Sequence, residues 1–526
     1  MDDWLPVPTP TGRSGLRRLL LVGTGVFVAT LIVYILTMSP TVNSFDSGEF
    51  IAGAYVMGII HSPGYPLYLL LGYLISHLTS GDVAYSVNLL SATFGAATAT
   101  IVFFSSYLLS GRYWSAVLAA FLLAFSLLFW SQSLIAEVYT LNTLLIGCIS
   151  LAVIQFYRRP ATNTLITLGF VFGLSLTHHP SAAILIPGLL IILLAKRAAL
   201  RQMSIRELSS AVLAFLLPLS LYLYLPLRFR ADPAINYVGD YFAADLGTIE
   251  GFLWMVSGRM FSSELLGRTP LSAWAEIVSI VKRMWLDFYG IGFLLVIVGL
   301  GHLRREKPLF RFYLVSIITT LLFFAFYDVV DSQVMVLPIY VLSAPLAALG
   351  LAFMVNSFSP KQDEWLTRPW PAVIVVSVAG LVMLAVNWSV VSRRDDRMAY
   401  DVGIRILESV EENSVILTQW TVATPLEYLQ IVEGHRPDVS IIDRGLLGLG
   451  IRDHLKRSGA FDESAYQSAV SGELIQIVEQ NLGQFRVYLT EQDPVMISLF
   501  CVQPIHDDVL YEITGTLPSC LNDVPD

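Results

Sequence analysis

Eleven apolar stretches, most of them about 20 residues long, constrain this chain of 526 residues more than any other feature. A run of about 20 apolar residues crosses the hydrocarbon core of a bilayer as a helix. Only 14% of the residues are charged, whereas a soluble domain carries about 25%. We therefore predict an all-α polytopic membrane bundle and exclude an ordinary cytosolic enzyme. The expected spans are at about 19–38, 84–109, 113–131, 138–157, 163–178, 180–195, 208–227, 286–303, 310–327, 334–356 and 371–392.

The distribution of Lys and Arg predicts the orientation of these spans, because cytoplasmic loops are enriched in both residues. Basic residues such as Arg18, Arg158 and Arg304 fall between alternate spans, whereas the first loop (39–83) has neither Lys nor Arg. The N-terminus is therefore expected in the cytoplasm, and its apolar run is expected to be an anchor and not a cleaved signal. An odd number of spans then places the C-terminal region outside. The expected location is the cell membrane, as a multi-pass protein of the inner or plasma membrane.

The composition changes near residue 393. From Arg393 onward the chain has 22 acidic and 10 basic residues, against a net charge of −9 for the whole. We predict two domains, a transmembrane domain (1–392) and a soluble extracytoplasmic domain (393–526). The absence of a basic surface argues against nucleic-acid binding.

The pattern within the C-terminal region predicts a small α/β fold. Strand-like segments at 415–417, 439–442 and 485–489 alternate with a helix-like segment at 425–432. The region has no phosphate-binding loop, so we expect a lid or an acceptor-binding domain; the alternative is a stabilising cap. Cys501 and Cys520 could pair outside the cell or could be unrelated thiols.

Titratable and cationic residues gather in the loops on the predicted outer side. Such groups are costly at membrane depth and usually mark function. Each has a structural explanation when taken alone: an acid at a helix start, a histidine in a turn, or an arginine anchored at the headgroups. Their occurrence in five loops of one face predicts a single extracytoplasmic site. The candidates are Asp46, Glu49, His61, Tyr65, Glu137, Tyr139, His178, His179, Arg228 and Arg230, with Asp328 and Asp331 in the fifth loop.

The first outer loop contains an apolar segment, Leu67 to Leu78, that is too short to span a bilayer. Its length and its tyrosines are typical of a helix lying at the membrane interface. A loop of this kind could bring a lipid-borne substrate and a soluble one together.

The same loop carries a motif that resembles a known family. The motif runs Phe45-Asp46-Ser47-Gly48-Glu49-Phe50, then Gly58, then His61-Ser62-Pro63-Gly64-Tyr65-Pro66. It resembles the signature of a polytopic membrane family, widespread in bacteria, that includes an animal transmembrane protein O-mannosyltransferase. More distantly it is similar to the GT-C superfamily of lipid-dependent glycosyltransferases. Ser62 departs from the pattern, since relatives commonly have proline there. Weaker similarities lie at Ala136 to Tyr139, at His178 to Pro180, at Leu225 to Arg228, at Asn236-Tyr237 and from Val415 to Asp443.

The resemblance implies a GT-C fold with about 11 transmembrane helices, in which the first outer loop supplies a catalytic carboxylate. It also implies a polyprenyl-phosphate-linked sugar donor, with mannose as one candidate, and an exported protein or glycan as acceptor.

General chemistry then suggests roles for the candidates in an inverting transfer. A carboxylate must deprotonate the acceptor hydroxyl, for which we choose Asp46, with Glu49 orienting a substrate. Cations must meet the charge that grows on the leaving phosphate, for which we choose Arg228 and Arg230. The histidines could donate to sugar or phosphate, and Tyr65 and Tyr139 could stack on a sugar.

Two alternatives remain at this stage. Asp46, Glu49, His61, His178 and His179 could ligate a divalent metal, but no metal-binding spacing is present, so no cofactor is expected. The chain could also be a transporter or flippase of a lipid-linked or small polar solute. Transporters bury charges at the midplane between repeated halves, whereas here the charges lie on one face and no repeat is evident.

Overall fold

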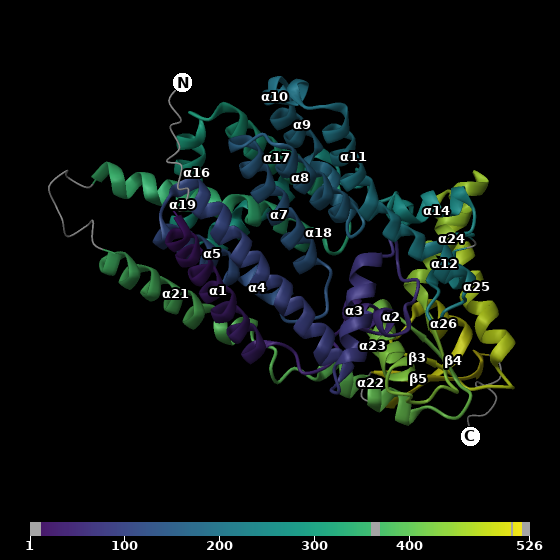
Figure 1. The fold of residues 1–526 in the computed structure, drawn as a ribbon. Coiled ribbons are helices and arrows are strands. Elements are labelled where there is room, and N and C mark those ends of the chain that lie inside the picture. Colours follow the sequence, from purple (N-terminus) through teal and green to yellow (C-terminus); the bar gives the residue numbers. More distant parts are fainter. Residues whose placement is uncertain (1–11, 243, 359–368, 507–508, 518–526) are drawn as a thin grey trace.

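The computed structural model describes residues 12–242, 244–358, 369–506 and 509–517. Most of these residues are helical, and a small sheet lies toward the C-terminal end of the chain (Figure 1). Cys501 is disulfide-bonded, whereas Cys520, Lys361 and Arg368 lie outside the described residues.

Long apolar helices form the main body of the molecule. Each expected span coincides with a helical segment, and among the described residues six helices are long and apolar enough to cross a membrane on their own. Shorter apolar helices lie at the other expected positions. The segments are α1 (Gly12–Thr37), α4 (Val83–Ser110), α5 (Tyr113–Ala124), α6 (Leu127–Gln132), α7 (Tyr139–Arg158), α8 (Thr162–Leu176), η1 (Pro180–Leu185), α9 (Ile186–Ala195), α10 (Arg197–Gln202), α11 (Ile205–Leu219), η2 (Ser220–Leu223), α12 (Tyr224–Arg230), α16 (Ile291–Leu303), α17 (Lys307–Phe326), α18 (Ser332–Met335), α19 (Leu337–Phe358) and α21 (Pro369–Val391).

Local signals explain where these helices begin and end. Asp82 caps α4 by accepting a hydrogen bond from the backbone N–H of Tyr85, and Gly111 ends the helix in the left-handed conformation. Ser204 and Glu207 form a reciprocal capping box at the start of α11. These side chains satisfy backbone groups that a helix end leaves without partners.

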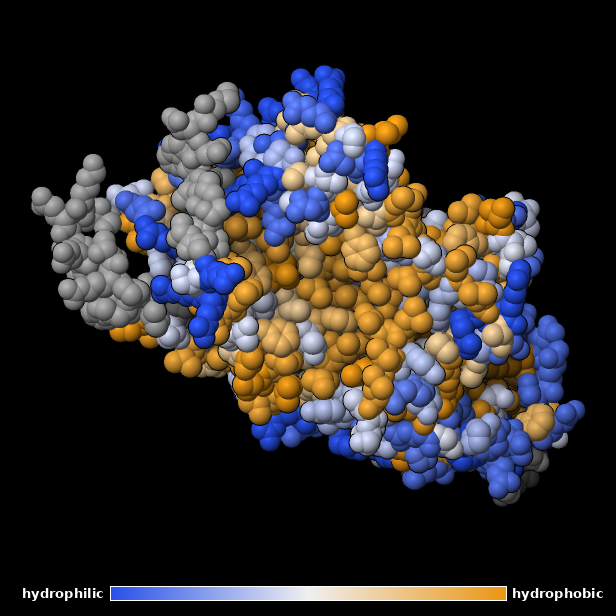
Figure 2. Space-filling model, in the orientation of Figure 1, coloured by the Kyte–Doolittle hydropathy of each residue, from blue (hydrophilic) through white to orange (hydrophobic). Residues whose placement is uncertain are grey.

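The bundle is arranged around α7 and α19, which are its most deeply buried long helices. The space-filling view shows an apolar surface over the helical bundle and a more polar surface over the C-terminal domain (Figure 2). This is the distribution expected of a multi-pass membrane protein with a water-exposed domain at one end.

One expected span differs from the prediction at its start. The apolar run at 286–303 is divided between α15 (Pro270–Asp287) and α16, which meet at an angle of 106°. Tyr289 and Gly290 occupy positive φ at the break. The two helices together are apolar enough for one span, so hydropathy averaged over the run does not show the bend, although Asp287 and Gly290 interrupt it.

The first outer loop folds into two helices. They are α2 (Asp46–Val56) and α3 (Pro66–Leu78), joined by a loop that turns back over α2. The predicted helix at 67–78 is therefore confirmed, while its position at the membrane interface stays a prediction. The fourth outer loop contributes α13 (Tyr237–Tyr241), α14 (Ile249–Val256) and η3 (Arg259–Phe261).

The C-terminal region forms a five-stranded mixed sheet in the order β2-β1-β3-β5-β4. The predicted strands at the positions of β1, β2 and β3 are confirmed and are parallel to one another. The antiparallel pair β4 and β5 was not expected. The elements are α22 (Met398–Ser409), β1 (Val415–Thr418), α23 (Trp420–Ile431), β2 (Ser440–Asp443), α24 (Arg444–Ser458), α25 (Glu463–Asn481), β3 (Val487–Leu489), α26 (Pro494–Leu499), β4 (Phe500–His506) and β5 (Leu510–Thr516).

Candidate active site

The site is built on the first turn of α2, where Asp46 and Glu49 lie close together. Phe45, the residue before the helix, has a φ of 63°. A positive φ is strained for a bulky side chain and recurs at functional sites. Negative charge is favourable at this end of a helix because the free N–H groups point toward it.

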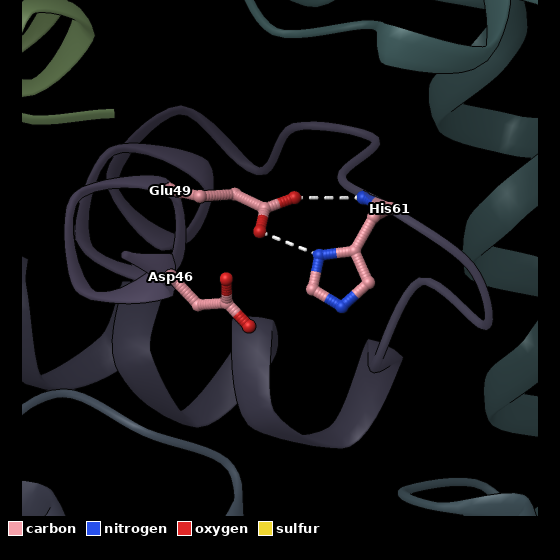
Figure 3. Close-up of side chains that lie close together, drawn as sticks. All are labelled: Asp46, Glu49 and His61. Atoms are coloured by element: carbon pink, nitrogen blue, oxygen red, sulfur yellow. Dashed lines mark hydrogen bonds and ion pairs between the residues drawn. The ribbon is translucent and has the colours of Figure 1, made fainter. Parts of the chain in front are cut away.

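Glu49 forms a buried pair with His61, which the loop after α2 carries back over the helix (Figure 3). Nδ1 of His61 lies 2.6 Å from Oε2 of Glu49, and the His61 backbone N–H donates to Oε1 at 2.7 Å. Burial alone would lower the pKa of His61, but the charge and hydrogen bond of Glu49 outweigh it and raise the pKa to about 9. Burial raises the pKa of Glu49 as well, so one proton is held between His61 and Glu49.

Asp46 lies beside this pair but is held differently (Figure 3). It is only partly buried, and its Oδ1 accepts a 2.6 Å hydrogen bond from the indole N–H of Trp420. Trp420 begins α23 of the C-terminal domain, so this domain contacts the candidate site directly.

Close packing fixes α23 against α2, as the neighbouring ribbons suggest (Figure 1). A Cβ atom at Gly48 would overlap the backbone carbonyl of Thr424, so only glycine fits there. The Thr424 hydroxyl donates to the carbonyl of Phe45, next to Asp46. The hydroxyl of Tyr237, on α13, donates to Glu427 of α23.

Aromatic residues and histidines from other outer loops surround the pair. The hydroxyl of Tyr65 is 3.3 Å from Nε2 of His61, and its ring centroid is 6.0 Å from those of His178 and His179. The hydroxyl of Tyr139 donates to Asp331 at 3.0 Å. Burial and the charge of Asp46 raise the pKa of Asp331 to about 6.

The two predicted arginines lie apart from this cluster. Nε and Nη2 of Arg228 donate to the carbonyls of Met57 and Val56, at 2.7 Å and 3.2 Å. Arg228 therefore supports the C-terminal end of α2, where carbonyls lack intrahelical partners. Arg230 is exposed.

Sequence reasoning missed Trp420. The residue lies two positions after the end of β1, the strand between its parallel neighbours β2 and β3. Open α/β sheets present binding residues at such carboxyl ends, where the chain direction of the connections reverses. The predicted strand followed by an aromatic residue was the signal that could have identified it.

A metal ion is the remaining chemical possibility for the cluster. Candidate ligand atoms of Asp46, Glu49 and His61 lie within 4.8 Å of one another, while His178 and His179 are not part of that group. Both oxygens of Glu49 already accept hydrogen bonds from His61. In the structure Glu49 is therefore paired with His61.

Known proteins similar to this chain agree with the motif resemblance. A family model described as the N-terminal domain of protein O-mannosyl-transferase TMEM260 matches residues 46–202. The mouse (Mus musculus) protein O-mannosyl-transferase TMEM260 is 27% identical over 83% of this chain and 64% of its own length. The corresponding protein of Dictyostelium discoideum is 24% identical over 80% of this chain and 57% of its own length. The resemblance predicted from the first loop is thereby confirmed, although the chain spans less than two thirds of either relative.

The fold also matches a solved structure. ArnT from Cupriavidus metallidurans bound to undecaprenyl phosphate superposes with a TM-score of 0.58, at 11% identity, over 93% of this chain and 97% of that one. The predicted GT-C-like fold, a helical membrane bundle with a small C-terminal α/β domain, is therefore confirmed.

Proposed function

We propose that this protein is an inverting membrane glycosyltransferase that moves a sugar, with mannose as the first candidate, from a polyprenyl phosphate to a hydroxyl of an exported protein or glycan. The observation that carries the proposal is the partly exposed Asp46 carboxylate beside the buried Glu49–His61 pair, at the junction with the C-terminal domain. The named relatives and the undecaprenyl-phosphate complex of ArnT support this choice of donor and acceptor.

The hydrogen bonds distinguish the two carboxylates. Glu49 is fully buried and both its oxygens are engaged by His61. Asp46 is partly exposed and uses Oδ1 for Trp420, which leaves Oδ2 for a substrate. We therefore assign the general base to Asp46 and an electrostatic role to Glu49.

The reaction needs one proton transfer and one displacement. Asp46 takes the proton of the acceptor hydroxyl while that oxygen attacks the anomeric carbon from the face opposite the phosphate. The bond between the anomeric carbon and the phosphate oxygen breaks, and the polyprenyl phosphate leaves with the bonding pair. The configuration at the anomeric carbon is inverted, and the proton remains on Asp46.

Cationic groups would stabilise the phosphate as it leaves. The His61 imidazolium is one candidate, since it lies in the cluster itself. Arg228 is a second, because Nη1 is free when Nε and Nη2 hold the carbonyls of α2. Arg230, which is exposed, is the third and could reach a lipid headgroup.

The assignment of Asp46 as the base implies an orientation of the protein in the membrane. The cluster would face the extracytoplasmic side of the cell membrane, with the N-terminus in the cytoplasm. The C-terminal domain would lie above the cluster, where α23 and α13 can contact an acceptor and a donor held in the membrane can reach Asp46.

The test compares Asp46→Asn with Glu49→Gln in purified full-length protein in detergent, given polyprenyl-phosphate mannose and an acceptor peptide. Wild type should form mannosyl peptide without any gradient. Loss of a general base costs about 100- to 10,000-fold, so Asp46→Asn should lose turnover and retain donor binding. Glu49→Gln should lose less turnover than Asp46→Asn.

Asp395→Asn is the matched control, because its side chain is 85% exposed on a surface turn and should leave transfer unchanged. Full turnover by Asp46→Asn would contradict the assignment of the base. An absence of transfer by wild type, together with gradient-driven flux in vesicles, would favour a transporter.

A further inference from the structure

Two buried side chains next to the cluster carry polar atoms that have no hydrogen-bond partner. They are Oε2 of Glu137 and Nδ1 of His178. Glu137 is 5% exposed and His178 is 0% exposed. An unpaired buried polar atom is destabilising, so native proteins keep such atoms where water or a ligand pairs them.

The hydrogen bonds of His178 define what its free nitrogen can accept. Nε2 lies 2.8 Å from the carbonyl oxygen of Val138, and a carbonyl only accepts, so Nε2 carries the hydrogen. Nδ1 is then a bare acceptor. Burial lowers the pKa of His178 to about 4, so the ring stays neutral at physiological pH. Its missing partner is a donor such as a hydroxyl.

Glu137 is also suited to a neutral partner. Its backbone N–H donates to the hydroxyl of Ser91 at 3.3 Å, which fixes the start of α7. Burial, followed by the charges of Asp46 and Asp331, raises the pKa of Glu137 well above its ordinary value. The protonated acid offers one donor and one acceptor.

Glu137 and His178 belong to one wall of the site. Val138, which accepts from His178, is the residue after Glu137. The ring of Tyr68 stacks on His178 with centroids 6.3 Å apart, and its hydroxyl lies 3.3 Å from that of Ser91. An aromatic wall, in which Tyr68 is 0% exposed, therefore adjoins two hydrogen-bonding groups.

This combination favours a sugar ring over a phosphate. A pyranose offers an apolar face of C–H groups and an edge of hydroxyls, and small-molecule sites pair apolar walls with a few placed polar groups. A phosphate needs cations or N–H donors, and this wall has no Lys or Arg.

We propose that Glu137 and His178 form a subsite for the hydroxyl edge of the uncharged sugar ring of the donor, separate from the groups that meet its phosphate. The proposal rests on the proposed function, since it assumes that a sugar-bearing lipid reaches the cluster. It gives His178 the role of an acceptor and not of a proton donor.

The test measures binding of two lipids, polyprenyl-phosphate mannose and bare polyprenyl phosphate, to full-length protein in nanodiscs. Wild type should bind the mannosyl lipid more tightly. His178→Gln keeps an N–H donor for Val138 but removes the acceptor at Nδ1. It should weaken binding of the mannosyl lipid about tenfold, equivalent to about 1.4 kcal/mol. The affinity for bare polyprenyl phosphate should stay within about twofold of wild type.

Glu137 offers a second pair of variants. Glu137→Gln keeps an uncharged donor and acceptor, so it should retain most of the preference for the mannosyl lipid, whereas Glu137→Ala should lose it. His77→Gln is the control, because His77 is exposed on α3 and stacks on Tyr55 away from the pair. The melting temperature of each variant confirms folding.

The outcomes separate the two proposals. If wild type transfers mannose but binds both lipids equally, or if His178→Gln and Glu137→Ala keep the full preference, the subsite is wrong and the transferase stands. If wild type transfers no sugar from any polyprenyl phosphate, the proposed function fails and the subsite fails with it.

Discussion

The indole N–H of Trp420 donates a hydrogen bond of 2.6 Å to Oδ1 of Asp46, from a residue 374 positions later in the chain. The bond fixes one oxygen of the candidate base and leaves the other free. The C-terminal domain is therefore part of the site's structure and is more than a cap over it.

Trp420→Phe should keep the ring packing against His61 and Tyr237 and remove only the donor. Because hydrogen bonds to charged groups contribute about 1.5–3 kcal/mol, we expect kcat to fall at least about tenfold. The KM for the donor should change little. Trp274→Phe, on the exposed face of α15, is the control. An unchanged kcat in Trp420→Phe would show that Asp46 needs no positioning from the domain.

Gly48→Ala should separate α2 from α23, because the added methyl group overlaps the Thr424 carbonyl. Overpacking of this kind costs about 1–3 kcal/mol. We expect a large loss of transfer and faster limited proteolysis of the C-terminal domain. Gly25→Ala is a matched control, since nothing lies within 4 Å of a Cβ at Gly25 in α1. Wild-type activity in Gly48→Ala would mean that the contact between α2 and α23 is dispensable.

Arg228 and Arg230 should differ when each is changed to alanine. Arg228→Ala removes two hydrogen bonds to the end of α2, so both the melting temperature and kcat should fall. Arg230→Ala removes an exposed side chain, so it should raise the donor KM at unchanged melting temperature if Arg230 contacts the phosphate. Kinetics at several donor concentrations, with a melting curve for each variant, separates the two effects. An unchanged donor KM in Arg230→Ala would exclude that contact.

Glu427 should make stability depend on pH. Burial, helped by the charges of Asp443 and Glu49, raises the pKa of Glu427 to about 8 from 4.5, against the hydrogen bond from Tyr237. The folded protein thus holds a proton that the unfolded chain releases above pH 4.5. The contribution of this proton to the free energy of unfolding is complete below pH 4.5. It is lost as the pH rises to about 8, at up to about 1.4 kcal/mol per pH unit.

The measurement for Glu427 is the melting temperature of wild type and Glu427→Gln at pH 5 and pH 8. Glutamine mimics the protonated acid, so the variant should resemble wild type at pH 5 and be more stable than wild type at pH 8. An equal difference at both pH values would contradict a buried, protonated Glu427.

Removal of divalent metals should leave transfer within about twofold of its starting rate, because His61 already occupies both oxygens of Glu49. The experiment is EDTA treatment followed by desalting and assay of full-length protein. A loss of activity that Mg²⁺, Mn²⁺ or Zn²⁺ restores would assign a metal to Asp46, Glu49 and His61.

The helices and the first-loop site could be predicted because their signals are local. An apolar run of about 20 residues predicts a membrane-spanning helix and its length without other information. Asp46, Glu49 and His61 all lie within one loop. The bend between α15 and α16 was missed because the mean hydropathy of the whole run outweighs Asp287 and Gly290. The strand β4 was missed because Pro504 interrupts an alternation that is already short, and its antiparallel partner β5 was missed with it.

Long-range contacts account for the rest. Nothing in the sequence around Trp420 predicts its hydrogen bond to Asp46, and nothing around Arg228 predicts its hydrogen bonds to the end of α2. Pairings of this kind depend on how the bundle and the C-terminal domain pack together. The pattern within a single segment does not predict that packing.

The bond between Asp46 and Trp420 also bears on how the protein is made. At about 5–20 residues per second, the ribosome needs roughly 20 to 75 s to add the 374 positions that separate the two residues. During that interval Asp46 is synthesised without its partner. A nascent chain already inserted in the bilayer therefore lacks the partner of its proposed base until the domain that carries Trp420 has folded against α2, so interrupted synthesis should release inert fragments.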